Sequence, residues 1–192
     1  MQIIFLDTRY FRSPLTRTDE RGAPGKERYL PDNDPNKTLL GKKQWEWLSN
    51  KLDENADIRI IASSIQIIAE GHGFEKWGNL PREKKKLYDL IDSKKIKDII
   101  FLSGDRHAGG IYKEKTTKGT MLYEITSSSL NLPGAEWVTK YKGKERPAEP
   151  GPNRIQPLYL WENYGFIEFT NNKIYLSLKD INGNQVNYIE IN

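Results

Sequence analysis

Asp105 and His107 have the residue types and the spacing of a metal-binding pair. They stand two positions apart in the segment SGDRH (103–107), and Gly104 gives the backbone freedom just before them. In an extended segment this spacing sends a carboxylate and an imidazole to the same side. Oxygen and nitrogen ligands together suit Zn, Mn or Fe better than an all-oxygen Ca or Mg site. A structural hydrogen-bonded pair is the alternative, and the two residues alone do not decide between these interpretations.

A second polar group, Asp7, Arg9 and Arg12, follows the apolar run at residues 3–6. In the functional interpretation, Asp7 is a ligand or an orienting carboxylate. Arg9 or Arg12 then presents its planar guanidinium to phosphate oxygens. In the alternative, the group is a salt bridge at the end of a strand.

His72 lies in the glycine-containing segment EGHG (70–73). One interpretation makes it a substrate-binding proton donor to a leaving group. The other makes it an exposed loop histidine.

Several other catalytic chemistries have no support in the sequence. The chain has no cysteine, which excludes a thiolate nucleophile and a cysteine-ligated metal. The serines at 127–129 have no His-Asp pattern nearby, and neither a phosphate-binding P-loop nor a dinucleotide fingerprint is present.

The elements that must position these residues alternate between strands and helices. Apolar runs at residues 3–6, 58–61 and 99–102 indicate strands buried on both faces. Helices are expected at 38–52, with Thr38 as N-cap and Trp47 on its apolar face, and at 81–92, where Pro81 opens the first turn. This order predicts an α/β layer structure. Polar clusters at 7–9, 63–66 and 104–107 follow the three strands, so we expect them to converge on one crevice.

Downstream of residue 110 the sequence becomes rich in short β segments. Strands are expected at 111–115, 121–126, 166–169, 174–178 and 186–191, with a hairpin turn at Asn182-Gly183. Residues 12–36 and 133–157 read as long surface loops.

Composition limits the class of protein. A chain of 192 residues with 36% hydrophobic and 11% aromatic content predicts one domain with a real core, spanning residues 1–192. The net charge of +4 and the interrupted lysine runs indicate a solvated face, so no nucleic-acid partner is expected. Residues 1–7 read as a strand and not a signal peptide, and no apolar run approaches the ~20 residues of a membrane span.

Six segments resemble, in order and spacing, successive segments of the PhoD-like (alkaline phosphatase D) metallophosphatase family. They are LDTRYFR (6–12), TLLGKKQWEWL (38–48), SSIQ (63–66), WGNLPRE (77–83), LSGDRH (102–107) and TSSSLN (126–131). The resemblance covers nearly the whole chain. The motifs are specific in combination, although each is weak alone.

This resemblance implies a calcineurin-like metallophosphoesterase fold, in which two packed sheets are flanked by helices. The implied activity is hydrolysis of phosphomonoesters or phosphodiesters. Metal ions (Ca, Fe, Mn or Zn) would bind the phosphate, lower the pKa of a bridging water and stabilise charge. Asp105 and His107 would be metal ligands and catalytic residues together with Asp7, while Arg9 and Arg12 would contact the phosphate.

The resemblance also implies that part of the domain is missing. Family members carry a metal-binding aspartate strand, a Gly-Asp segment and an Asp- and His-rich segment ahead of the Asp-x-Arg strand, and the 192 residues contain none of these. We expect that the sequence is a truncated reading frame. The alternatives are a product that needs its missing half and a degenerate domain. Relatives are commonly exported, so the compartment stays open.

Two further hypotheses remain. The chain could be a non-catalytic binding module that recognises polyanions or a protein partner. It could also be an unstable half-domain, with a sheet edge or face exposed next to residues 3–6.

Overall fold

The computed structural model describes residues 1–135, 151–170 and 173–191. The expected loop at 133–157 therefore lies partly outside the described residues. Among the described residues, neither helix is both long and apolar enough to cross a lipid bilayer.

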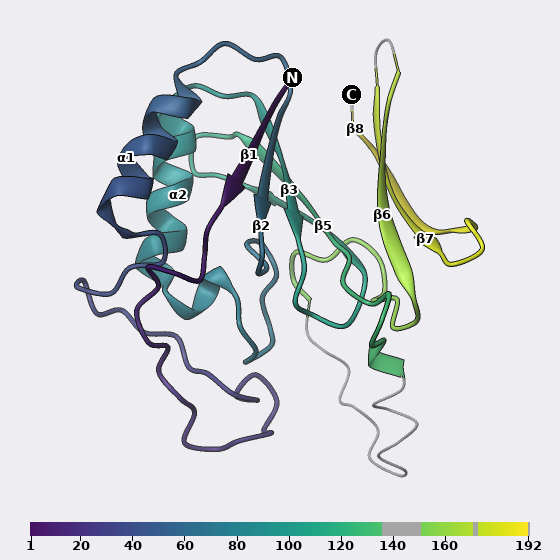
Figure 1. Cartoon of the computed structure of the whole chain (residues 1–192), viewed down its shortest axis with the longest axis horizontal. Coiled ribbons are helices and arrows are strands. Elements are labelled where there is room, and N and C mark those ends of the chain that lie inside the picture. Colours follow the sequence, from purple (N-terminus) through teal and green to yellow (C-terminus); the bar gives the residue numbers. More distant parts are fainter. Residues whose placement is uncertain (136–150, 171–172, 192) are drawn as a thin grey trace.

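Five strands form the larger sheet in the order β1-β2-β3-β5-β4 (Figure 1). They are β1 (Gln2–Leu6), β2 (Arg59–Ser63), β3 (Asp98–Ser103), β4 (Gly110–Lys115) and β5 (Met121–Thr126). The first four in this order run parallel, and β4 runs antiparallel to β5. Parallel pairing places the carboxyl ends of β1, β2 and β3 at one edge of the sheet, with Leu6 beside Ser63.

Helices cover one face of this sheet. They are α1 (Gly41–Leu52) and α2 (Pro81–Ser93), which a short 3-10 helix, η1 (Trp77–Asn79), precedes. Figure 1 shows both long helices on the same side. Pro81 opens α2 as expected, because an N-terminal residue needs no backbone N–H. Thr38 lies ahead of α1, and its hydroxyl accepts a hydrogen bond from the Gly41 N–H at 2.9 Å.

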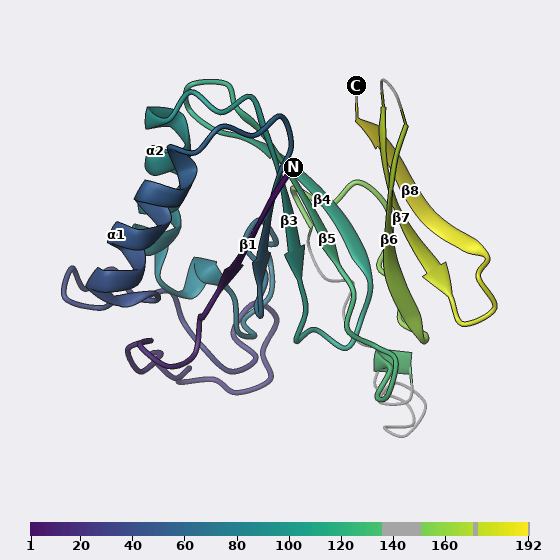
Figure 2. The same cartoon turned by 45° about the horizontal axis from the view of Figure 1, so that its top comes forward.

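The second sheet is antiparallel and contains β6 (Asn163–Phe169), β7 (Ile174–Asp180) and β8 (Gln185–Ile191). It packs against the face opposite the helices, over β4 and β5 (Figure 2). All eight strands and both helices were thus predicted, with small shifts in their bounds. The expected two packed sheets with flanking helices are present, and the described helices lie on one face of the larger sheet.

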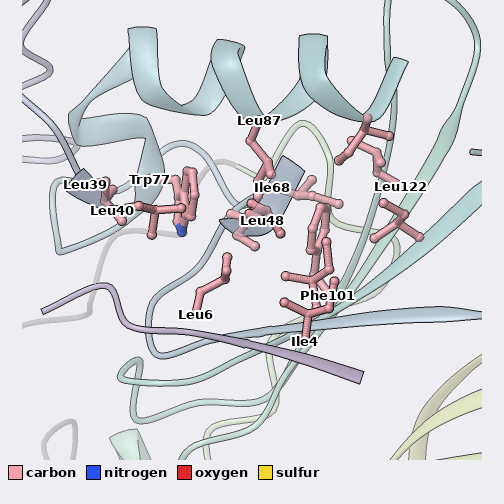
Figure 3. Packing of buried hydrophobic residues seen from close by; sticks show 14 of the residues in the cluster. Ile4, Leu6, Leu39, Leu40, Leu48, Ile68, Trp77, Leu87, Phe101 and Leu122 are labelled. Atoms are coloured by element: carbon pink, nitrogen blue, oxygen red, sulfur yellow. The ribbon is translucent and has the colours of Figure 1, made fainter. Parts of the chain in front are cut away.

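Two hydrophobic clusters fill the layers. The first lies between the helices and the larger sheet, where Leu48, Trp77 and Phe101 are fully buried (Figure 3). The second lies between the sheets and includes Ile125 and Leu176. At roughly 25 cal/mol per Å², the buried apolar area of these two clusters supplies the main favourable term in folding.

Two expectations about burial were wrong. Trp45, and not Trp47, faces the core from α1, and Trp47 is exposed. The first strand is buried on one face only: Ile4 is buried, whereas Phe5 is 74% exposed. The physical reason is position, because β1 is an edge strand that the second sheet does not reach.

Candidate functional site

The polar turns after β1, β2 and β3 meet at one edge of the sheet, as expected. The hydroxyls of Thr8 and Ser64 are 2.5 Å apart, which joins the first turn to the second. Arg9 Nη2 lies 2.7 Å from Asp105 Oδ2, which joins the first turn to the third. The convergence of the polar turns at the carboxyl ends of the parallel strands, which we inferred from the sequence, is therefore confirmed.

Arg9 lies between two carboxylates. Its Nη1 donates to Glu75 Oε2 at 2.6 Å, while its Nη2 donates to Asp105. Arg12 contacts the other oxygen of Glu75, and burial lowers the pKa of the Arg12 guanidinium without removing its charge. The arrangement places two guanidinium groups and two carboxylates in a short row beside the turn.

Asp7 shapes the first turn. Its Oδ1 accepts hydrogen bonds from the backbone N–H groups of Arg9 at 2.8 Å and Tyr10 at 2.9 Å. Both hydrogen bonds lower the pKa of the Asp7 carboxyl, and the bond from Tyr10 has the larger effect. The salt bridge expected between Asp7 and Arg9 is not the one that forms. Arg9 pairs with Glu75 and Asp105, and the Asp7 carboxylate accepts hydrogen bonds from the backbone. Asp7 therefore acts as the acceptor that orients Arg9.

The turn after β3 has unusual backbone geometry. Asp105 has φ of 60° and His107 has φ of 53°, so both lie in the left-handed region that non-glycine residues rarely adopt. The premise of an extended Asp-x-His segment was therefore wrong: the strand ends at Ser103 and the chain turns sharply. Left-handed residues of this kind cost on the order of 1 kcal/mol each and cluster at functional sites.

His107 is anchored from behind by the chain that follows β5. Its Nδ1 lies 2.7 Å from the carbonyl oxygen of Leu132, so Nδ1 carries the proton and donates it. Arg106, the residue between the two candidates, is buried. Its backbone N–H donates to Ser128 Oγ at 2.8 Å, and its guanidinium carbon lies 4.7 Å from the centre of the Phe74 ring.

Comparison with known proteins decides the family. The family model described as PhoD-like phosphatase matches residues 1–174. The chain belongs to the PhoD-like phosphatase family. Alkaline phosphatase D of Bacillus subtilis (strain 168) is 30% identical over an alignment of 142 residues, and the match covers 69% of this chain and 22% of that protein. A solved structure of PhoD aligns with a TM-score of 0.66 at 20% identity, covering 91% of this chain and 35% of that chain.

These figures set the scope of the family assignment. The PhoD structure supports the arrangement of the two sheets and their helices, and at 20% identity this similarity concerns the fold alone. The chain spans about a third of that structure and about a fifth of the curated relative. Membership of a phosphatase family favours the phosphoesterase hypothesis over the non-catalytic binding module.

The residues of this PhoD-like chain that the structure describes do not by themselves fit a metal ion. Within the described ranges, no group of three or more histidine, aspartate or glutamate side chains is arranged to hold one. Asp105 and His107 offer one oxygen and one nitrogen ligand, and the Asp105 carboxylate is paired with Arg9. Protein-bound Zn or Mn needs at least three such donors. The pair is therefore an incomplete donor set.

His72 was expected either to donate a proton to substrate or to lie exposed in a loop. The exposed-loop alternative was wrong, because His72 is 1% exposed. The role as proton donor stays a prediction. The Nδ1 atom of His72 accepts from the Phe74 N–H at 3.2 Å, and its Nε2 lies 2.9 Å from Gln66 Oε1. Gln66 in turn donates to Tyr112 and Thr126. His72 belongs to an internal hydrogen-bond network that ties the loop after β2 to β4 and β5.

Sequence reasoning missed two carboxylates, one that contacts the site and one that holds the loop after β2. Glu75, which holds Arg9 and Arg12, had no signal of its own, because it is one acidic residue in a loop. Glu124 did have a signal, since it interrupts the apolar strand MLYEIT of β5. It is 0% exposed and accepts bonds from the N–H groups of residues 67–69, at 2.8, 2.6 and 3.3 Å. Burial raises the pKa of Glu124, and these bonds oppose that rise.

Proposed function

We propose that this chain forms one wall of the active site of a phosphoesterase that hydrolyses phosphomonoesters or phosphodiesters. The supporting observation is the 2.7 Å contact between Arg9 and Asp105, which brings the turns after β1 and β3 together. We further propose that residues 1–192 are one partial domain of the calcineurin-like metallophosphoesterase class. Similarity to PhoD and the two-sheet architecture support this assignment.

In this proposal, Arg9 binds the anionic ester. Its side chain is 46% exposed, and its guanidinium already makes charge-assisted bonds to two carboxylates. A phosphate group offers the same oxygen geometry and more negative charge than a carboxylate, so it competes for the two Nη groups. Asp7 keeps Arg9 at this position through the backbone N–H bonds of the turn. Arg12, held by Glu75, adds positive charge to the same row.

Asp105 and His107 form the other part of the wall. The Leu132 carbonyl oxygen, 2.7 Å from Nδ1, fixes the orientation of the His107 imidazole. Asp105 and His107 both have left-handed backbone conformations, so their side chains point in directions that they would not take from an extended strand. We propose that hydrolysis depends on metal ions (Ca, Fe, Mn or Zn), held by Asp105 and His107 together with donors that further polypeptide beyond these 192 residues supplies.

A chimera tests this function. The chain is inserted into Bacillus subtilis alkaline phosphatase D in place of the 142-residue region that it matches. We expect the chimera to hydrolyse a chromogenic phosphate diester or monoester, and the isolated chain not to. Asp105→Asn and His107→Gln should each lower turnover by about 100-fold or more, as removal of a residue that stabilises charge in the transition state does. Arg82→Ala, at an exposed arginine on α2, is the matched control. Turnover unaffected by Asp105→Asn and His107→Gln would refute the site assignment.

A further inference from the structure

The segment HGFE (72–75) connects the buried hydrogen-bond network to the two arginines of the site. Its last residue, Glu75, contacts both of them: Arg9 Nη1 donates to Glu75 Oε2 at 2.6 Å, and Arg12 contacts Glu75 Oε1. The Glu75 side chain is 15% exposed, whereas that of Asp105 is 43% exposed. Charge-assisted bonds to a shielded carboxylate hold a guanidinium more firmly than an exposed ion pair does. The orientation of both arginines therefore depends on where the segment places Glu75.

His72 fixes the shape of this segment from its inner side. Its buried imidazole accepts a hydrogen bond from the Phe74 N–H at Nδ1, across 3.2 Å, and its backbone carbonyl accepts one from Lys76 Nζ. Phe74 and Lys76 are the two chain neighbours of Glu75, so both bonds fold the chain around His72. The other ring nitrogen, Nε2, lies 2.9 Å from Gln66 Oε1. One imidazole thus ties the turn that carries Glu75 to the buried network.

The loop at 25–29 closes the outer side of the same segment. Two backbone N–H groups of this loop donate to Gly73 O, at 2.8 and 3.1 Å, and Gly73 N donates to Glu27 Oε2. A Cβ at Gly73 would meet Glu27 N at 2.5 Å, so the segment has no room to move toward this loop. The segment is therefore held on both sides, by His72 within and by the loop outside.

We propose that His72 is a positioning residue for anion binding. Through the bond between its Nδ1 and the Phe74 N–H, it places the Glu75 carboxylate so that Arg9 and Arg12 face the ester. This inference rests on the proposed function, in which Arg9 binds the phosphate. It gives His72 an indirect role that its burial permits, because the imidazole acts through Glu75 and needs no contact with substrate.

Two substitutions of His72 separate positioning from simple stabilisation. The side-chain oxygen of asparagine takes the place of Nδ1, so His72→Asn keeps an acceptor for the Phe74 N–H and loses the contact with Gln66. The longer amide of glutamine reaches the place of Nε2, so His72→Gln keeps a donor for Gln66 and lacks the Nδ1 acceptor. Each variant loses one buried hydrogen bond, so we expect similar decreases in melting temperature. Only His72→Gln releases the turn that carries Glu75.

The first readout is the mobility of the Arg9 and Arg12 guanidinium groups in the ligand-free chain, measured by nitrogen NMR relaxation at Nε. His72→Gln should raise this mobility to the level found in Glu75→Gln. The double variant should show no further change, because His72 acts through Glu75. His72→Asn should keep the mobility of the unsubstituted chain.

The second readout is the affinity for inorganic phosphate, measured by amide NMR titration of the same chains. His72→Gln and Glu75→Gln should each weaken binding by about 10-fold, the effect of one misplaced charge-assisted hydrogen bond. His72→Asn should bind phosphate as the unsubstituted chain does.

Equal behaviour of His72→Asn and His72→Gln in both readouts would overturn the proposal, because His72 would then be a residue of stability alone. Tighter phosphate binding by Glu75→Gln would also overturn it, since the carboxylate would compete with the anion instead of placing the arginines. A direct proton donor would give a third pattern that contradicts the proposal: unchanged mobility and affinity in both variants, with turnover lost from both in the chimera.

Two further outcomes keep the test decisive. If neither His72 variant folds, Gly73→Ala gives the decision, because its Cβ must displace the segment. Unchanged mobility of Arg9 in Gly73→Ala would then overturn the proposal. If the unsubstituted chain binds no phosphate, the proposed function fails, and the guanidinium mobility alone decides whether His72 positions Glu75.

Discussion

Arg9 donates from Nη2 to Asp105 Oδ2 across 2.7 Å, which joins the turn after β1 to the turn after β3. The two side chains are 46% and 43% exposed, so water screens the ion pair. The strands, and not this pair, hold the two turns in place. Arg9 and Asp105 can therefore each exchange this ion pair for another charged partner.

Replacing Arg9 should affect anion binding far more than folding. We expect Arg9→Ala to change the free energy of unfolding by less than about 1 kcal/mol, the range of exposed ion pairs. Urea denaturation measures this change. A loss of several kcal/mol would show that Arg9 is a structural residue, and Arg82→Ala serves as the control for loss of an exposed arginine.

Acid should loosen the turn that Asp7 closes. The N–H bonds from Tyr10 and Arg9 lower the pKa of the Asp7 carboxyl. Because the pKa of Asp7 is lower in the folded state, its carboxylate stabilises the fold at pH values above the unfolded-state pKa. This contribution is lost as the pH falls through the folded-state pKa. An NMR titration of Asp7 and of the Arg9 and Tyr10 amides checks this.

The matched variant is Asp7→Asn, whose amide oxygen still accepts the two N–H bonds. It should keep the turn and remove its dependence on pH in the acid range. If Asp7 titrates at or above the ordinary aspartate value of about 3.9, the assigned role of its oxygen is wrong.

The left-handed conformation of Asp105 gives a prediction about glycine and alanine. Both Asp105→Gly and Asp105→Ala remove the contact with Arg9, but only alanine keeps a Cβ at φ of 60°. The glycine variant should be more stable than the alanine variant by about 1 kcal/mol. Thermal or urea unfolding measures the difference.

Gly104 supplies the control. A Cβ built there meets Ser128 Cβ at 3.6 Å, an ordinary contact, and its φ is not positive. Gly104→Ala should therefore not be destabilised. Equal stability of the two Asp105 variants would contradict the backbone geometry.

Glu124 should be a stability residue for the loop that follows β2. Glu124→Gln replaces one accepting oxygen by an NH₂ group that faces backbone N–H donors, which leaves a buried donor unpaired. We expect a loss of about 1–3 kcal/mol in the free energy of unfolding and faster amide exchange at residues 67–69. Glu168→Gln, at an exposed position on β6, should stay within about 0.5 kcal/mol. A neutral Glu124→Gln would show that those N–H groups have other partners.

Metal removal should leave the isolated chain unchanged. A ligand that binds only the native state raises the melting temperature, and its removal lowers it. Because the described residues hold no set of three donors, a chelator should not shift the melting temperature, nor should added Mn. A clear drop with chelator would show that the chain holds a metal through donors not recognised in its described part.

Most of the strands and helices could be predicted from local sequence patterns, and the site could be predicted in part. The runs at β2, β3 and β5 were readable because both of their faces are buried, so apolar residues are continuous. The convergence of the strand-end turns followed from parallel topology alone. Sequence could not reveal that β1 is an edge strand, because an apolar run looks the same whether or not a second layer covers it.

The missed details depend on tertiary placement. Burial of His72 arises from bonds with Gln66, whose side chain reaches across to β4 and β5. The partner of Arg9 could not be deduced, since Glu75 lies 66 positions away in a loop. The turn at Asp105 is a backbone property, and aspartate at that place does not signal it.

Titration of the isolated chain with inorganic phosphate, followed by two-dimensional amide NMR, tests the central claim most directly. At low ionic strength we expect the amides of Arg9, Asp105 and His107 to shift together and saturably, and Arg9→Ala to abolish the shifts while Arg82→Ala preserves them. Shifts confined to other surfaces, or shifts that persist in Arg9→Ala, would contradict the claim that the turns after β1 and β3 form one phosphate-binding edge.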